Sequence, residues 1–231
     1  MNNLELTVAL ATAPSTAFAE LRERPRFWFP LLLIVLTTVG VVYWYYSMVD
    51  IEWFKDLLFS NDSRFKEMGE DQRAAAMAMV NRTPLLWSSA VGTFIGIPIA
   101  FALEALYLLV AAKVTKIQLG FRHWFALASW SSLPLVLGNV VAAILLFLSD
   151  TSQVSPGALQ PLSLNELLLH RPMGSPGQAL FESLSIPTFL SFVLMIIGIR
   201  VWSQRSWAFS TTVVALPWVV IYACWAFFAF R

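Results

Sequence analysis

The sequence predicts an all-α polytopic membrane protein with five transmembrane helices, and three observations support this fold class. Of the 231 residues, 58% are hydrophobic and only 13% are charged, and the mean hydropathy is +0.69. This composition is far more apolar than that of an ordinary soluble domain. Five stretches of the chain lack Asp, Glu, Lys and Arg. Their lengths match the roughly 17 to 25 residues that a bilayer-spanning helix needs. None of them shows the strict alternation of a membrane β-barrel strand.

The N-terminal segment, residues 1–26, precedes the first span and is predicted to carry a short amphipathic helix. Ala17, Phe18 and Leu21 share one side of this helix, and charged residues occupy another. The pattern is typical of an interfacial helix that lies on the cytoplasmic leaflet. A disordered N-terminus with a chance pattern is the alternative. We therefore divide the chain into this cytoplasmic interfacial segment and a membrane domain of residues 27–231.

The spans follow the uncharged stretches. The first ends in the aromatic residues 43–46, whose amphipathic rings are typical of the headgroup level, and no small-residue cleavage site follows it. We interpret it as a retained span and not as a signal peptide. Pro98 is expected to kink the second span, and Pro134 falls within the third. The predicted spans are residues 27–48, 85–113, 124–148, 183–200 and 206–230.

The two outside segments are predicted to contain short helices. In residues 50–84 the apolar residues recur at helical spacing, and the later part is rich in helix-favouring Ala and Met, which excludes a β-hairpin. In residues 150–182 several Pro and Gly exclude one long helix. Ser163 and Glu166 there form a capping-box pattern that opens a short helix over residues 164–169.

The distribution of charge predicts the orientation of the chain. With a cytoplasmic N-terminus, the inside segments hold eight Lys and Arg against three acids, and the outside segments hold seven against ten. Short loops that are rich in Lys and Arg stay on the cytoplasmic side. We therefore expect the N-terminus to be cytoplasmic and the C-terminus to lie outside.

Several diffuse motifs resemble those of the Yip family (Ypt-interacting proteins), in particular its bacterial branch, and the resemblance covers nearly the whole chain. They are the segment 14–25 leading into Phe27, Glu104-Ala-Leu-Tyr107 running to Lys113, Trp130-Ser-Ser-Leu-Pro134, Gly198-Ile-Arg200 and Trp207-Ala-Phe. The resemblance implies a five-span domain with a cytoplasmic N-terminus, here in a bacterial cytoplasmic (inner) membrane. Eukaryotic members are linked to Rab-type GTPases, vesicle budding and organelle shape. Their long cytosolic N-terminal extension has no counterpart in this sequence, so the GTPase role is not carried over.

Motifs of enzymatic chemistry are missing from the sequence. It has no phosphate loop, nucleophile elbow, paired catalytic carboxylates or dinucleotide fingerprint. His170 stands alone, without the Cys or His at ligand spacing that a zinc site needs, so it is interpreted as a surface residue. We expect no catalytic residue, no metal, no cofactor and no nucleic-acid partner.

Two functions remain, and the first is a non-catalytic membrane organiser or accessory subunit. Its N-terminal helix and basic turns would bind the anionic lipid bilayer, a partner membrane protein or a second copy of the chain. Each basic residue near the surface contributes about 1 kcal/mol to such binding. The alternative for each of these residues is that it only sets topology. The candidate contacts are Arg22, Arg24, Arg26, Lys113, Lys116 and Arg122.

The second function is a small-solute or ion transporter or channel that uses Glu104, an acid inside a predicted span. Such residues are costly in a bilayer and usually face the bundle interior or a water-filled cavity. A structural carboxylate that hydrogen-bonds to neighbouring hydroxyls is the alternative. Glu104 lies nine residues, or about 13 Å of helix, from Lys113, and five hydroxyls lie at similar depths in other spans. Glu104 is therefore predicted to face this belt, which consists of Ser131, Ser132, Ser191, Thr37 and Thr38.

The orientation can be tested with reporter fusions at Lys116 and at Ser163. We expect the two reporters to fall on opposite sides of the membrane, with Lys116 cytoplasmic, because the short basic loops stay inside. The enzymatic activity of alkaline phosphatase fusions and the fluorescence of green fluorescent protein fusions measure the side on which each position lies. Two reporters on the same side would contradict the topology.

Overall fold

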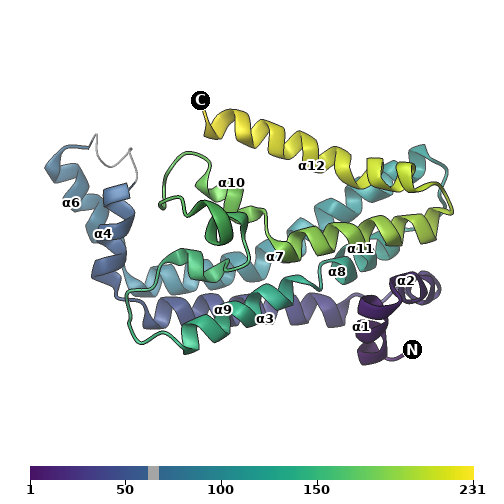
Figure 1. The fold of residues 1–231 in the computed structure, drawn as a ribbon, viewed down its shortest axis with the longest axis horizontal. Coiled ribbons are helices and arrows are strands. Elements are labelled where there is room, and N and C mark those ends of the chain that lie inside the picture. The colour runs from purple at the N-terminus through teal and green to yellow at the C-terminus, as the bar shows by residue number, and fades with distance from the viewer. Residues whose placement is uncertain (62–67) are drawn as a thin grey trace. The chain divides into compact units, whose positions relative to one another are not determined.

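The computed structural model describes residues 1–61 and 68–231, and Figure 1 shows that this part of the chain is built from helices. No strand occurs among the described residues, and Ser163 and Ser185 form one isolated β-bridge. The all-α prediction is confirmed. The elements are α1 (Asn3–Thr12), α2 (Pro14–Glu23), α3 (Trp28–Met48), α4 (Ile51–Asn61), α6 (Glu70–Met79), α7 (Arg82–Val114), α8 (Phe121–Ser131), α9 (Leu135–Phe147), η1 (Pro156–Leu159), η2 (Asn165–Leu169), α10 (Gln178–Ser183), α11 (Ile186–Ser203) and α12 (Trp207–Ala229).

The five predicted spans are confirmed. Within the described residues, five segments are long and apolar enough to cross a membrane, so the chain is a multi-pass membrane protein. They are α3, α7, the pair α8 and α9, α11 and α12. The second span begins earlier than predicted, at Arg82, because the charged residue can sit beyond the apolar stretch while the backbone is already helical.

The third span differs from the expected single helix, because α8 ends at Ser131 and α9 begins at Leu135. Pro134 lacks an N–H group and disfavours helical geometry in the residue before it. The intervening turn is closed instead by hydrogen bonds from the Leu133 N–H to the Trp130 carbonyl (3.2 Å) and from the Leu135 N–H to the Ser132 carbonyl (3.0 Å). By contrast, α7 continues through Pro98.

The contacts divide the chain into two compact units, which are described separately. The first unit contains Met1–Val35, Ile95–Leu135 and Pro187–Ala223, and the second contains Leu36–Phe94, Val136–Ile186 and Cys224–Arg231.

Three buried tryptophans form the centre of the first unit, and each indole N–H donates to a backbone carbonyl. Trp130 donates to Arg26 (2.6 Å), Trp202 to Phe18 (2.7 Å) and Trp124 to Leu119 (3.3 Å). Buried indoles need such partners, because an unmet N–H costs free energy away from water. Two of the three acceptors belong to the N-terminal segment, so α2 and the chain after it are tied directly to the spans.

Gly198 of α11 lies where three helices of this unit pack closely together. A Cβ atom at this position would overlap the Leu127 side chain of α8 and would lie 3.2 and 3.3 Å from ring atoms of Phe18 in α2. Only glycine leaves that space open. Ala17, Phe18 and Leu21, which were predicted to share one side of a helix, are all buried, which confirms the amphipathic pattern of α2.

In the second unit, Arg82 closes the end of α3. Its guanidinium donates to the carbonyls of Tyr46 (3.0 Å), Ser47 and Val49 (2.8 Å). The last carbonyls of a helix have no partner within the helix, and a cation also interacts favourably with that end of the dipole. Tyr45 adds a hydrogen bond to the Val154 carbonyl (2.8 Å).

The two segments that were predicted to lie outside, residues 50–84 and 150–182, contain short helices in their described parts. Between residues 50 and 84 the structure has α4 and α6, as predicted, and residues 62–67 lie outside the described part of the chain. The predicted short helix over residues 164–169 appears as η2, a wider turn closed by a bond from the His170 N–H to the Asn165 carbonyl (2.7 Å). The Ser163 hydroxyl accepts from the Glu166 N–H (3.2 Å), which is one half of the capping box.

The substitution Gly198→Ala tests the close approach in the first unit. We expect it to lower the free energy of unfolding by about 1 to 3 kcal/mol, because Leu127 and Phe18 must shift to admit a methyl group. Thermal unfolding in detergent and protease cleavage after α2 measure the loss.

Gly96→Ala is the matched control, because a Cβ atom there meets no atom within 4 Å. In a helix interior this change is expected to stabilise by up to about 1 kcal/mol. Equal effects of the two substitutions would contradict the packing described at Gly198.

Candidate functional site

The first unit contains a partly open cavity of about 530 Å³, lined by α7, the turn between α8 and α9 with the first residue of α9, α11 and α12. Glu104 lines it from α7. The other polar side chains of the lining are Tyr107, Ser132, Thr188, Ser191 and Trp218. The remaining lining residues are apolar. A volume of this size is typical of sites that hold small molecules.

Glu104 is the charged side chain of the cavity lining, and its carboxylate has no hydrogen-bond or ion-pair partner among the described residues. The Tyr107 hydroxyl donates to the Val213 carbonyl (2.7 Å), and the Ser191 hydroxyl donates to the Pro187 carbonyl (2.9 Å). Both hydroxyl hydrogens are therefore engaged, and the two oxygens can only accept further hydrogen bonds. Among the described residues, no hydrogen bond or ion pair reaches the Glu104 carboxylate.

The structure brings together part of the predicted hydroxyl belt. Ser132 and Ser191 line the same cavity as Glu104. The Ser131 hydroxyl is buried without a hydrogen-bond partner in the described part of the chain and is not among the lining residues. Thr37 and Thr38 belong to the second unit, where their hydroxyls accept from the Asn139 amide (2.9 and 2.8 Å).

The aromatic part of the lining was not predicted from the sequence, although a signal for it exists. Tyr107 lies three residues after Glu104, which is one turn further along the same side of α7. On α12, Val214, Pro217, Trp218 and Ile221 share one side through spacings of three and four. Extending the helical spacing from each polar candidate would have found Tyr107 but not Trp218, whose helix carries no acid.

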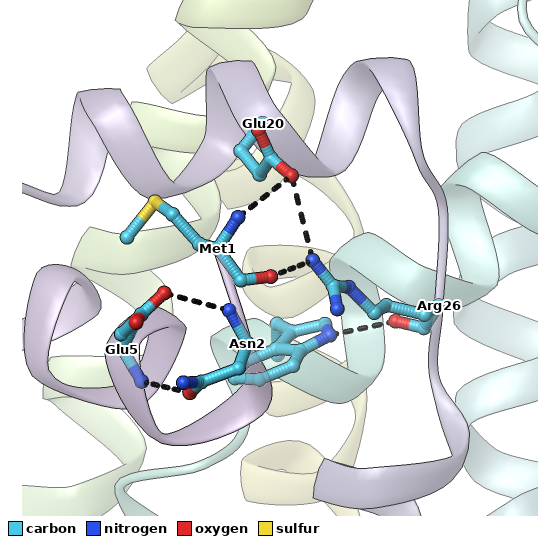
Figure 2. A network of polar contacts seen from close by, with 6 residues as sticks. Met1, Asn2, Glu5, Glu20 and Arg26 are labelled. Carbon is cyan, nitrogen blue, oxygen red and sulfur yellow. Dashed lines mark hydrogen bonds and ion pairs between the residues drawn. The ribbon is translucent and has the colours of Figure 1, made fainter.

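A second group of residues ties the N-terminal helices together, as Figure 2 shows. The Glu20 carboxylate pairs with the Arg26 guanidinium (3.4 Å) and with the Met1 amino group (3.3 Å). The same guanidinium donates to the Met1 carbonyl. Asn2 and Glu5 form a complete capping box at the start of α1. These contacts hold α1 against α2 and the entry to α3.

The placement of α2 corrects one expectation. Its apolar side was predicted to meet the leaflet, but Phe18 packs on Leu127 and Gly198 and is fully buried within the protein. Amphipathic spacing shows that a helix buries one side and does not say whether lipid or protein covers it.

The preceding helix, α1, was not predicted. It is apolar on two sides: Leu6, Ala9 and Leu10 are buried. Leu4 and Val8 are 71% and 62% exposed.

The six basic candidates fall into two groups, and all of them lie in the first unit. Arg26 is engaged with Glu20 and Met1. The side chains of the other five form no hydrogen bond or ion pair within the described residues, and they are Arg22, Arg24, Lys113, Lys116 and Arg122.

Comparison with known families decides the identity of the chain. A family model described as the Yip1 domain matches residues 8–228, from within α1 to the end of α12. The chain belongs to the Yip1-domain family. The resemblance inferred from the sequence motifs is thereby confirmed. Comparisons with curated proteins and with solved structures gave no match for this Yip1-domain protein.

Proposed function

We propose that this Yip1-domain protein is a non-catalytic membrane organiser that binds the anionic surface of the membrane it spans. The observation that carries the proposal is the outward face of α1. A helix that faces water on one side is usually polar there. On α1 that side presents Leu4 and Val8, one turn apart and largely exposed, with Glu5 and Thr12 at its edge. An apolar outward face at the boundary of a membrane protein is matched by lipid.

The direction of α1 supports the same proposal. Figure 1 shows α1 beside α2, near the end of the first unit where α11 ends, with its axis turned steeply away from the direction of α11. A helix turned steeply away from the spans at their ends lies close to the plane of the membrane, where an interfacial helix belongs. The Met1 amino group pairs with Glu20 and the Met1 carbonyl accepts from Arg26, and these contacts hold the start of α1 against α2.

The unpaired basic side chains supply the electrostatic part of the proposed binding to anionic lipid. Arg22 and Arg24 flank α2, and the α7–α8 connection carries Lys116, with Lys113 and Arg122 at its edges. Each cation near an anionic leaflet contributes about 1 kcal/mol. Anionic lipid faces the cytoplasm, so the proposal includes a cytoplasmic N-terminus in a bacterial inner membrane. A partner membrane protein or a second copy of the chain would use the same surface.

The double substitution Leu4→Glu and Val8→Glu tests the organiser function. A nitrobenzoxadiazole dye on Ala11→Cys, in a Cys224→Ala background, reports whether α1 contacts lipid. In nanodiscs that contain brominated phosphatidylglycerol, we expect the dye to be quenched, and the double substitution to abolish the quenching, because charges on this face are expelled from lipid. In reconstituted vesicles, the double variant should lose the change in vesicle shape that the unsubstituted protein produces.

The matched control adds the same two charges to exposed positions of α2, through Ser15→Glu and Thr16→Glu, and should behave as the unsubstituted protein. An unquenched dye, together with equal vesicle shapes for all variants, would refute the organiser function. These point substitutions are sharper than deletion of residues 1–24, which would also remove Phe18 and Leu21 from the core.

A second candidate function is passage of a solute or ion through the first unit, and the Glu104 cavity favours it. Ionisable groups that face cavities inside membrane proteins often mark ion and substrate pathways. Glu104→Gln keeps the size of the side chain and removes its charge. Under this function it should abolish proton- or cation-coupled flux into proteoliposomes, whereas Glu23→Gln, on the exposed side of α2, should leave the flux intact. Equal flux for both variants would exclude a role of Glu104 in transport.

A further inference from the structure

We propose that the cavity of the first unit binds an organic ammonium group attached to an apolar body. The Glu104 carboxylate would pair with the ammonium group, and the aromatic side chains of α11 and α12 would enclose it. This inference concerns a ligand site and rests on the cavity alone, independently of the N-terminal helices that carry the organiser function.

The unpaired carboxylate and two of the lining hydroxyls favour a ligand that donates hydrogen bonds. Glu104 contributes a carboxylate with no partner in the described part of the chain. The Tyr107 and Ser191 hydroxyls donate hydrogen bonds to backbone carbonyls, so toward the cavity they can only accept. A primary ammonium carries three N–H donors, and a hydrogen bond between two charged groups is stronger than one between neutral groups.

The charge of the lining favours a cation. Among its residues, Glu104 is the one charged side chain, and no Lys, Arg or His accompanies it. An unpaired carboxylate inside a membrane-spanning region is costly, and a bound cation removes that cost. An anionic ligand would meet the same carboxylate without compensation.

The aromatic side chains add a second source of attraction for a cation. Trp218 stacks on Tyr222, with ring centroids 5.3 Å apart at 14°, and Phe192 and Trp218 form a T-shaped pair with centroids 6.1 Å apart at 86°. These contacts hold the Trp218 indole in place at the cavity wall. The faces of Trp and Tyr attract organic cations, most strongly where water is excluded.

The size and the remaining lining favour an organic ligand over a bare metal ion. The cavity measures about 530 Å³, which is far larger than any ion. Ca²⁺ takes six to eight oxygen ligands. The described residues contain no group of three or more His, Cys, Asp or Glu that could hold a metal. Aliphatic and aromatic side chains such as Phe101, Leu108 and Met195 complete the lining, and they suit an apolar body.

Equilibrium binding of tritiated phenylbutylamine to the full chain in phosphatidylcholine nanodiscs tests the proposal, with phenylbutanol as the neutral analogue. We expect saturable binding of the amine to one site. Glu104→Gln should weaken amine binding roughly thirtyfold or more, since the buried ammonium loses its charged partner. Phenylbutanol should bind Glu104→Gln and the unsubstituted protein alike. Trp218→Leu should weaken amine binding by roughly threefold to thirtyfold through loss of the cation–π contact.

Glu23→Gln is the matched control and should bind the amine as the unsubstituted protein does. The melting temperature of each variant verifies that it is folded. Equal amine affinity of folded Glu104→Gln and of the unsubstituted protein would overturn the proposal, and so would equal affinity of the unsubstituted protein for the amine and the alcohol.

A second arm identifies the source of the ammonium group. Phosphatidylethanolamine is added to the nanodiscs at increasing fractions. Competition with the amine would support the site and assign it to a lipid headgroup. Undiminished amine binding would support the site and assign it to a free amphiphilic amine. Neither result depends on α1, so a failure here is separable from a failure of the organiser function.

Discussion

The packing of α2 against α8 and α11 is the constraint on which the arrangement of the first unit depends. The missing side chain of Gly198 leaves room for Leu127 and the Phe18 ring, and the Trp202 indole donates to the Phe18 carbonyl. Apolar contact and a buried hydrogen bond therefore act at the same residue. The apolar side of α2 is buried against the protein. The helix of the N-terminal segment that has exposed apolar residues is therefore α1, which packs on α2.

Charged side chains near the spans are treated in two ways. Arg82 neutralises helix-end carbonyls in the second unit, and Arg26 pairs with Glu20 in the first, so each charge has a partner in the protein. Glu104 has no partner among the described residues and faces a cavity instead. In a bilayer an unmet charge is costly. This contrast makes Glu104 the residue on which both the transport function and the proposed ligand site depend.

Sequence reasoning found part of the cavity and missed part of it. Counting the rise per residue gave the depth of Glu104, and Ser132 and Ser191 at that depth do line the same cavity. Depth does not give the direction of a side chain around its helix axis. Ser131, one residue from Ser132, consequently lies outside the lining, and Thr37 and Thr38 pair with Asn139 in the second unit. Trp218 was missed because it sits in an uncharged helix without a distinguishing local pattern.

The sequence by itself determined the all-α class, the five spans and the family. These properties follow from composition, from the length of uncharged stretches and from short motifs, each of which is a sum over neighbouring residues. Only the tertiary structure decided that α2 turns its apolar side to protein, that the third span breaks before Pro134 and that Glu104 shares a cavity with Trp218. Those features depend on which helices meet and at what rotation. Such contacts join residues far apart in the chain, and hydropathy along one helix carries no information about them.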